Sequence, residues 1–404
     1  MASNSAELAK EDGYRFARRM SLIRVSAVRE ILKVTEQPDI ISFAGGLPAP
    51  ELFPVDALAR AHAEIFAESG AAAMQYSTTE GWLPLREWIA ARLNQHWIRT
   101  DASRILITSG SQQGIDLVAR AFLDAGDQVI VENPCYLAAL QTFGAYEAGF
   151  IPVESDDDGM RMDDLEQALK DSRAKLIYIV ADFHNPKGTT LSLERRRRMV
   201  ELARKHNVPI LEDDPYGELR YRGERLPSLA SLDDHGTVIY ISTFSKTISP
   251  GMRIGWVAAS AEVIHALVIA KQAADLHTST IEQRAAARML DRFEYDEHVA
   301  HLNKVYGERS ALMLDSLERH FPAEARWTKP DGGLFLWIEL PESISGEDLV
   351  QEALYEKVAF VPGAPFFAGE PRHNFIRLNF SNSTPERIEE GIKRISVILK
   401  RRLQ

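Results

Sequence analysis

One lysine stands out in this chain because of the residue types around it. Lys246 lies in the segment Thr243-Phe244-Ser245-Lys246, after the apolar run 238–241, and Arg253 follows seven residues later. A lysine in a turn at the end of a buried strand is partly desolvated, which favours its neutral, nucleophilic amine. Such an amine condenses with an aldehyde to give a Schiff base. The hydroxyl groups and the arginine beside it are suited to bind a phosphate.

An aldehyde that carries a phosphate describes pyridoxal 5'-phosphate, and a second segment fits the same cofactor. Asp213, Asp214 and Tyr216 follow the apolar run 208–212. The cofactor needs a carboxylate at its pyridine nitrogen, because a protonated ring accepts electrons when a substrate bond breaks. A phenol three residues further on can hydrogen-bond the ring 3-oxygen. Asp213 with Tyr216 has this spacing, whereas Asp214 would pair with position 217, which is a glycine.

A third segment has the character of a phosphate-binding turn. Residues 108–114 read Thr-Ser-Gly-Ser-Gln-Gln-Gly, after a predicted strand and at the start of a predicted helix. Free backbone N–H groups at a helix N-terminus bind phosphate, and Gly110 lets the backbone come close to it. Ser111 and Gln112 add side-chain donors. An ordinary serine-capped helix explains the segment equally well, and no Walker-type lysine follows.

Three further residues are candidates for the same site. Asn185 lies in an Asn-Pro turn after the run 175–180, and Tyr136 follows another strand and could stack on a flat ring. Arg377 lies in an apolar strand, where a guanidinium is costly unless it is paired, and its planar fork matches a carboxylate. Each has an ordinary alternative, namely a loop residue, a core aromatic residue or an internal ion pair.

The elements that position these residues are strands alternating with helices. The strands are continuous apolar runs, as in a sheet covered on both faces: residues 104–108, 128–131, 175–180, 208–212 and 238–242. Helical stretches between them, such as 112–123 and 193–206, predict a mainly parallel α/β sheet. The strand-like segments 333–340 and 375–380, with a helix after Thr384, predict a smaller α+β domain.

The domain prediction has three parts. Residues 1–50 join the small domain, residues 51–295 form the large cofactor-binding domain, and residues 296–404 form the small C-terminal domain. The four arginines 195–198 are predicted to lie on a solvated helix face.

Composition excludes several classes of protein. The 404 residues are 45% hydrophobic and carry a net charge of -11, which argues against nucleic-acid partners and anionic membrane surfaces. The single cysteine, Cys135, excludes a disulfide within the chain and a cysteine-based zinc site. No apolar run approaches the ~20 residues that span a bilayer. We therefore predict a cytoplasmic protein without a metal site.

As an ordered set, the motifs resemble the class I and II aminotransferases, and most closely the branch of 2-aminoadipate and kynurenine/aminoadipate aminotransferases. The resemblance covers nearly the whole chain and rests on segments 42–48, 75–77, 110–113, 245–246 and 377–380. It implies the PLP-dependent transferase fold of type I, with a mainly parallel seven-stranded sheet in the large domain plus the small α+β domain. Lys187 departs from the family pattern, which usually reads Asn-Pro-Thr-Gly. Its role near the site stays open, and the simplest expectation is a side chain that points to solvent.

The resemblance also implies roles at the cofactor. Lys246 would hold the cofactor as a Schiff base and move the substrate proton, and Asp213 would pair with the ring nitrogen. Tyr216 and Asn185 would hydrogen-bond the ring 3-oxygen, and Tyr136 would stack on the ring. The phosphate would be bound by Ser111, Gln112, Ser245 and Arg253, with Thr243 as an additional candidate.

Further roles concern the partner subunit and the substrate. Tyr76 would reach the phosphate in the partner subunit, so that a homodimer shares its active sites. Arg377 would bind the substrate α-carboxylate, with Gly46 and Asn185 beside the substrate. Arg29, in the segment 21–33, would pair with an acidic substrate side chain.

The reaction implied is a ping-pong transamination. The amino group would pass from an L-amino acid of the 2-aminoadipate, aromatic, branched-chain or glutamate type to a 2-oxoacid such as 2-oxoglutarate. Another reaction of pyridoxal phosphate, such as decarboxylation or β-elimination, stays open because the cofactor carries out the bond-breaking chemistry. A third alternative is a cofactor-sensing transcription regulator, which would need an N-terminal DNA-binding domain that residues 1–50 are too few to form.

Overall fold

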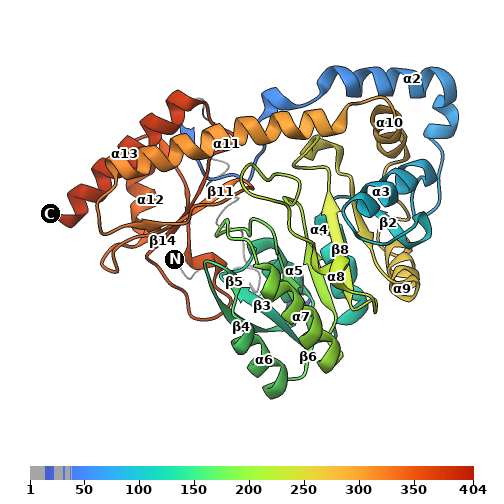
Figure 1. Cartoon of the computed structure of the whole chain (residues 1–404), viewed down its shortest axis with the longest axis horizontal. Coiled ribbons are helices and arrows are strands. Elements are labelled where there is room, and N and C mark those ends of the chain that lie inside the picture. Colours follow the sequence, from blue (N-terminus) through green and yellow to red (C-terminus); the bar gives the residue numbers. More distant parts are fainter. Residues whose placement is uncertain (1–13, 22–30, 32–36, 38) are drawn as a thin grey trace.

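The computed structural model describes residues 14–21, 31, 37 and 39–404. In this part of the chain, the largest sheet has eight strands in the order β2-β9-β8-β7-β6-β3-β4-β5 (Figure 1). Their bounds are Ile105–Thr108, Gly255–Ala258, Val238–Thr243, Ile210–Asp213, Ala174–Ile179, Gln128–Asn133, Gly149–Asp156 and Gly159–Met160. Among these strands, β9 and β5 run in the direction opposite to the other six. The carboxyl ends of the other strands therefore meet at one edge.

The predicted mainly parallel sheet is confirmed, with one strand more than the seven expected. The additional strand is β5, which forms a short hairpin with β4 through the pairing of Asp156 with Gly159. Asp156 accepts a hydrogen bond from the Asp158 N–H at 2.9 Å, and Gly159 has a φ of +89°, which a glycine adopts readily. The chain can therefore reverse immediately after β4.

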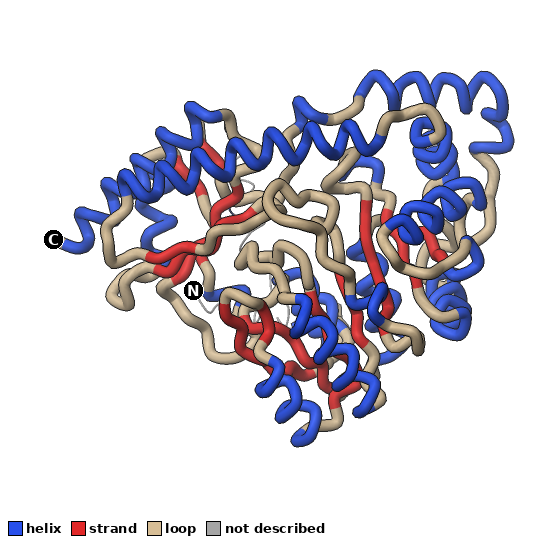
Figure 2. The backbone as a smooth tube through the Cα atoms, viewed as in Figure 1, coloured by secondary structure: helices blue, strands red, loops and turns tan. Residues whose placement is uncertain are grey.

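Helices cover both faces of this sheet (Figure 2). One face packs on α4 (Ser111–Phe122), α5 (Leu137–Ala145) and α9 (Ala261–Gln272); the other packs on α6 (Met162–Asp171), α7 (Leu193–His206) and α8 (Leu229–Leu232). In β3, Val129 and Val131 belong to the first core and Ile130 to the second. This alternation explains why the strands are apolar throughout rather than at every second position.

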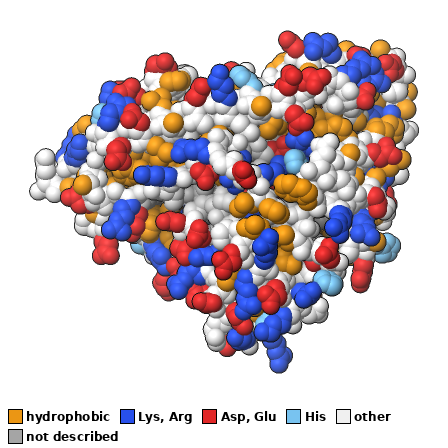
Figure 3. Space-filling view, viewed as in Figure 1, with side chains coloured by type: hydrophobic (Ala, Val, Ile, Leu, Met, Phe, Trp, Pro, Cys, Tyr) orange, Lys and Arg blue, Asp and Glu red, His pale blue; other side chains and the backbone are white. Residues whose placement is uncertain are grey.

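A third cluster of apolar residues closes the β2 end of the sheet. It is formed with α2 (Val55–Ala73), α3 (Leu83–Gln95) and α10 (Thr280–Leu290). Short 3-10 helices connect the larger elements: η2 (Arg18–Ser21), η3 (Pro50–Leu52), η4 (Ala102–Arg104), η5 (Pro250–Met252) and η6 (Ala364–Phe366). Figure 3 shows acidic and basic side chains interspersed over one face of the molecule. Within the described residues, no helix is both long and apolar enough to cross a membrane.

The C-terminal part forms a second, smaller assembly. Its antiparallel sheet has the order β10-β11-β14-β13, with bounds Arg326–Trp327, Phe335–Glu339, Phe375–Asn379 and Val361–Pro362. Its helices are α11 (Tyr295–His320), α12 (Gly346–Tyr355) and α13 (Pro385–Leu403), and α11 extends from the α10 end of the molecule to α13 (Figure 1). Strand β1 (Ile41–Ser42) pairs with β12 (Val358–Ala359), so residues near the N-terminus are hydrogen-bonded to this part. The exact domain boundaries remain a prediction.

The basic run 195–198 is not wholly solvated, so that prediction is wrong for Arg196. Its side chain is fully buried, and its Nη1 and Nη2 donate to the Asp182 carboxylate at 3.0 and 2.9 Å. Its Nε donates to the Leu191 carbonyl at 2.8 Å. Consecutive residues of a helix point in different directions, so one arginine of the four faces inward. There it holds both ends of the loop that carries Asn185.

The packing of α13 on the N-terminal segment yields a testable prediction. A Cβ added at Gly391 would lie 2.5 Å from two atoms of the buried Phe43 ring. Gly391→Ala should lower the free energy of unfolding by about 1–3 kcal/mol, because the ring has to move. Gly144→Ala is the matched control, since a Cβ there meets nothing within 4 Å and should be neutral or slightly stabilising. Equal urea midpoints for the two variants would contradict this packing.

Candidate active site

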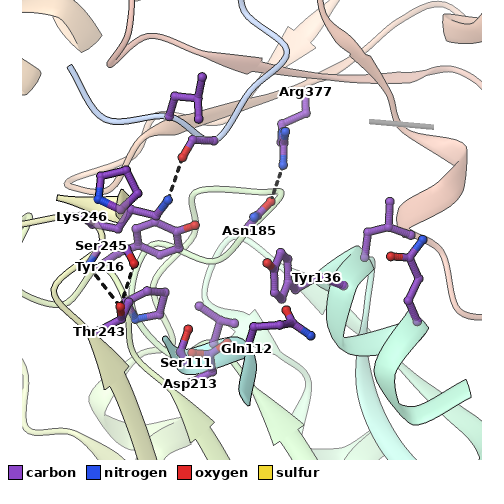
Figure 4. A pocket seen from close by; sticks show the side chains of 18 of the residues that line it. Ser111, Gln112, Tyr136, Asn185, Asp213, Tyr216, Thr243, Ser245, Lys246 and Arg377 are labelled. Atoms are coloured by element: carbon purple, nitrogen blue, oxygen red, sulfur yellow. Dashed lines mark hydrogen bonds between the residues drawn. The ribbon is translucent and has the colours of Figure 1, made fainter. Parts of the chain in front are cut away.

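A cavity of about 340 Å³ lies at the carboxyl edge of the large sheet, where this edge faces the small assembly. It is lined by loops after β2, β3, β6, β7 and β8 and by residues near β1, η6 and β14. Figure 4 shows side chains from these separate elements converging on it. The cavity brings together most of the predicted site residues: Gly46, Ser111, Gln112, Tyr136, Asn185, Asp213, Tyr216, Ser245, Lys246, Arg253 and Arg377, as well as Thr243.

Lys246 is held in the cavity in a form suited to attack an aldehyde. Its Nζ donates to the Gly46 carbonyl at 2.7 Å. Burial lowers the pKa of Lys246 to about 8, assisted by the positive charges of Arg377 and Arg253 and opposed by Asp213. A substantial fraction of the amine is therefore neutral near physiological pH.

Only one of the two adjacent aspartates faces the cavity. Asp213 ends β7, and its Oδ2 accepts from the Tyr178 hydroxyl at 2.8 Å, while its Oδ1 is buried and has no hydrogen-bond partner among the described residues. Burial raises the pKa of Asp213 to about 7, with a smaller contribution from Asp214. Asp214 turns away and accepts from the Gly217 N–H at 2.7 Å and the Tyr240 hydroxyl at 2.8 Å. The preference for Asp213 agrees with this arrangement.

Two phenols and an amide surround the centre of the cavity. Burial raises the pKa of Tyr136 to about 12 and raises the pKa of Tyr216 well above its usual value, so both remain protonated donors. The nearby Asn185 amide partly opposes the rise in the pKa of Tyr216. Val180, just after β6, also lines the cavity. It was not predicted, because an apolar residue after an apolar strand has no feature that distinguishes it from the core.

One end of the cavity has the chemistry of a phosphate site. Ser111 and Gln112 form the first turn of α4, where backbone N–H groups have no partner within the helix. Gly110 precedes them with a φ of +80°, and an added Cβ would lie 2.3 Å from Arg253 Nη2. Glycine is therefore needed for both the backbone conformation and the approach of the arginine.

Hydroxyl groups and Arg253 complete the end of the cavity at the N-terminus of α4. The Ser245 and Thr243 hydroxyl oxygens lie 2.8 Å apart, and the Thr243 hydroxyl also donates to the Ile254 carbonyl at 2.8 Å. Arg253 Nη2 donates to the Ser109 carbonyl at 3.0 Å. The guanidinium is thus oriented against the turn that carries the free N–H groups.

Arg377 has the properties of a carboxylate-binding residue. It is buried, and its guanidinium carbon lies 4.4 Å from the centre of the Phe335 ring and 5.1 Å from that of Phe366. Its Nη1 donates to Asn185 Oδ1 at 2.8 Å and its Nη2 to the Ala44 carbonyl at 2.7 Å, while Nε has no partner in the described part of the chain. Burial lowers the pKa of Arg377 to about 10, which leaves it cationic at neutral pH. No described carboxylate pairs with it, so the internal ion-pair alternative is not supported.

Two predicted residues are not brought into the cavity. Tyr76 is 78% exposed, and its ring contacts that of His277 at a centroid distance of 5.8 Å. Arg29 lies outside the described residues. The expectation for Lys187 is wrong: its side chain is buried, and its Nζ donates to the Ser155 carbonyl and hydroxyl at 3.1 Å and to the Asp156 carbonyl at 2.8 Å. Three acceptors at the end of β4 outweigh the cost of taking this ammonium out of water.

The donor set fits pyridoxal phosphate. A lysine of lowered pKa can take up the aldehyde, and the free Asp213 oxygen can accept from a ring nitrogen. The α4 N-terminus with Arg253 suits the phosphate. Arg377 has no acidic partner among the described residues, so its guanidinium could pair with an acidic group of a ligand.

Comparison with known proteins agrees with this geometry. Residues 38–395 match the family model of aminotransferase class I and II. The chain is 42% identical to aromatic-amino-acid aminotransferase 1 of Thermococcus litoralis, over 95% of this chain and 93% of that protein. Kynurenine aminotransferase of Pyrococcus horikoshii, solved in complex with PMP, is similar with a TM-score of 0.92 and 42% identity, over 96% of this chain and 98% of that one. Alpha-aminoadipate aminotransferase of Thermus thermophilus, complexed with N-(5'-phosphopyridoxyl)-L-leucine, has a TM-score of 0.91 and 41% identity at the same coverage.

The pKa of Lys246 predicts how cofactor capture depends on pH. Only the neutral amine reacts, so the rate at which cofactor-free protein takes up pyridoxal phosphate should rise with pH and level off above about 8. Stopped-flow absorbance across a pH series measures this rate. A rate that keeps rising beyond about pH 9, as an ordinary lysine would give, contradicts the desolvation argument.

Proposed function

Since the chain belongs to the class I and II aminotransferases, we propose a substrate range and a role for each residue of its cavity. The protein is an aminotransferase that uses pyridoxal phosphate. Transamination is favoured over decarboxylation, elimination or a regulatory role, because the two relatives at 42% identity are aminotransferases that match over 93% and 96% of their own length. The finer proposal is that it transfers the amino group of long apolar, aromatic or 2-aminoadipate-type L-amino acids to a 2-oxoacid such as 2-oxoglutarate.

The observation that carries this proposal is the buried Arg377, whose guanidinium has no carboxylate partner among the described residues. Its cationic guanidinium faces the same cavity as the Lys246 amine. An amino acid whose α-carboxylate pairs with Arg377 would place its Cα–H bond between the arginine and the lysine. The contact of Arg377 Nη1 with Asn185 at 2.8 Å keeps the guanidinium oriented toward this position.

The other residues act on charge and on protons. When bound, pyridoxal phosphate supplies the aldehyde and an electron-accepting ring that weakens the substrate Cα–H bond. Asp213 would accept a hydrogen bond from the ring nitrogen and keep it protonated through its free Oδ1. Tyr216 and Asn185 would hydrogen-bond the 3-oxygen, and Tyr136 would stack on the ring. Lys246 would take the Cα proton and return it.

The wall of the cavity beyond these groups suits a long side chain. Leu47, Leu137, Ala138 and Phe366 line it with apolar surface. A leucine-like or aromatic side chain can be buried there without leaving a polar group unpaired. For 2-aminoadipate or glutamate we propose that Arg29 supplies the pairing charge, as the resemblance of segment 21–33 implies.

We also propose a homodimer with shared active sites, located in the cytoplasm. Tyr76 does not line the chain's own cavity, and its 78% exposure leaves the phenol available to a neighbouring subunit. The single, buried Cys135 suits a reducing compartment.

Replacement of Arg377 tests whether its guanidinium binds the substrate α-carboxylate. Arg377→Lys removes the planar fork, so the KM for the amino donor should rise about tenfold or more, with a smaller change in kcat. Steady-state kinetics with leucine and 2-oxoglutarate, following glutamate formation, measure both constants. Arg99→Lys is the control, since the Arg99 side chain is 90% exposed and distant from the cavity. An unchanged KM in Arg377→Lys would refute the assignment.

Replacement of Arg29 tests the substrate range. Arg29→Ala should lower kcat/KM for 2-aminoadipate about tenfold, because a charge pair is lost, and leave leucine unaffected. Absorbance spectra of the wild type with each donor give an independent ranking, since a productive donor shifts the visible band toward the near-ultraviolet. An equal loss on both donors would show that Arg29 does not recognise the acidic side chain.

Mixed dimers test the shared site. Lys246→Ala chains lack the amine, and Tyr76→Ala chains should bind the phosphate weakly. Co-expression of the two should produce hybrids in which one site combines Lys246 with the partner's Tyr76, so activity at limiting cofactor should exceed that of either variant alone. Activity equal to that of the Tyr76→Ala chains alone would contradict sharing.

A further inference from the structure

The turn at the phosphate end of the cavity is held by side chains from outside it. Gly110 N–H donates to the Thr108 carbonyl at 2.9 Å, but the Ser109 N–H has no backbone acceptor in the part of the chain that the structure describes. It donates instead to Gln113 Oε1 at 2.8 Å. A glutamine in the first turn of α4 that folds back on a preceding N–H resembles half of a capping box. The orientation of Gln113 therefore controls the Ser109–Gly110 turn.

Gln113 is fixed in turn by an ion pair behind the cavity. Lys271, in the last turn of α9, donates to Gln113 Oε1 at 2.7 Å and to both oxygens of Asp275 at 2.8 and 2.9 Å. Gln113 Nε2 donates to Asp275 Oδ2 at 2.7 Å, which closes a ring of three side chains. All three protons of the ammonium are used, and the Ser109 hydroxyl lies 3.4 Å from the same Asp275 oxygen.

The burial of Lys271 requires an explanation beyond packing. Its side chain is 0% exposed, whereas that of Asp275 is 30% exposed. A buried ion pair is often no more stabilising than apolar residues of the same volume. Unlike an apolar residue, Lys271 donates hydrogen bonds in fixed directions, and these orient Gln113 and Asp275.

We propose that Lys271 and Asp275 are positioning residues for the cofactor phosphate, acting through Gln113 on the Ser109–Gly110 turn. The inference rests on the proposed placement of the phosphate at Ser111 and Gln112. With the ring intact, the free N–H groups of the first turn of α4 keep one direction and need no reorganisation when an anion binds. Without it, the turn loses its external support and phosphate affinity falls.

The test compares two ligands that differ only in the phosphate. Cofactor-free Lys271→Met protein is titrated with pyridoxal phosphate and with pyridoxal, and the absorbance change gives each Kd. Loss of a buried charged hydrogen-bond partner should weaken pyridoxal phosphate about tenfold, while pyridoxal, captured by Lys246 without a phosphate, should change less than about twofold. Inorganic phosphate should also compete less well with pyridoxal phosphate in the variant.

Controls separate positioning from folding. Asp275→Asn keeps the shape of the partly exposed partner of Lys271. It should weaken pyridoxal phosphate less than Lys271→Met does, again with little effect on pyridoxal. This variant replaces Lys271→Met in the test if Lys271→Met does not fold. Lys400→Met, at an exposed position in α13, should leave both Kd values unchanged. Equal weakening of the two ligands, or no weakening, overturns the inference. A wild type that binds pyridoxal as tightly as pyridoxal phosphate would instead overturn the placement of the phosphate.

Discussion

The structure depends on keeping three ionisable groups out of water around one cavity. Burial lowers the pKa of Lys246 to about 8, raises that of Asp213 to about 7 and lowers that of Arg377 to about 10. In each case burial moves the group toward its neutral form, as desolvation does. Bound cofactor and substrate would supply the counter-charges that the protein itself leaves out. Within the described residues, Asp213 Oδ1 and Arg377 Nε have no hydrogen-bond partner, which leaves both atoms for a bound ligand.

Such an arrangement is stable only if the surrounding polar groups are satisfied. Asp214, next to Asp213, accepts hydrogen bonds from the Gly217 N–H and the Tyr240 hydroxyl. The loop that carries Asn185 is fixed by the ion pair between Arg196 and Asp182. Lys187 ties the other side of that loop to the end of β4. Asp213 Oδ1 and Arg377 Nε, which belong to residues lining the cavity, are among the buried atoms that have no hydrogen-bond partner in the described part of the chain. Rigid neighbours keep these two side chains in place.

Residue types and spacing predicted much of the site, and their failures have a common cause. The correctly placed residues lie at strand ends or at a helix start, where local sequence determines the direction of the chain. They are Asp213 and Tyr216, Lys246, and Ser111 and Gln112. Arg196 and Lys187 were predicted to be solvated, since long basic side chains usually are. Their burial depends on acceptors in Asp182 and β4, which are distant in sequence or on another element. Val180 and Phe366 were missed because apolar residues carry no local sign of lining a cavity.

The sequence by itself determined the parallel sheet and the candidate cofactor-binding residues at its carboxyl edge, since these follow from local periodicity and from motifs a few residues long. Only the tertiary structure decided that Arg377 meets Asn185, that Gly46 accepts from Lys246, and that Lys271 donates to Gln113. These contacts join segments far apart in the chain. They are set by the packing of whole elements against one another, and no local pattern encodes that packing.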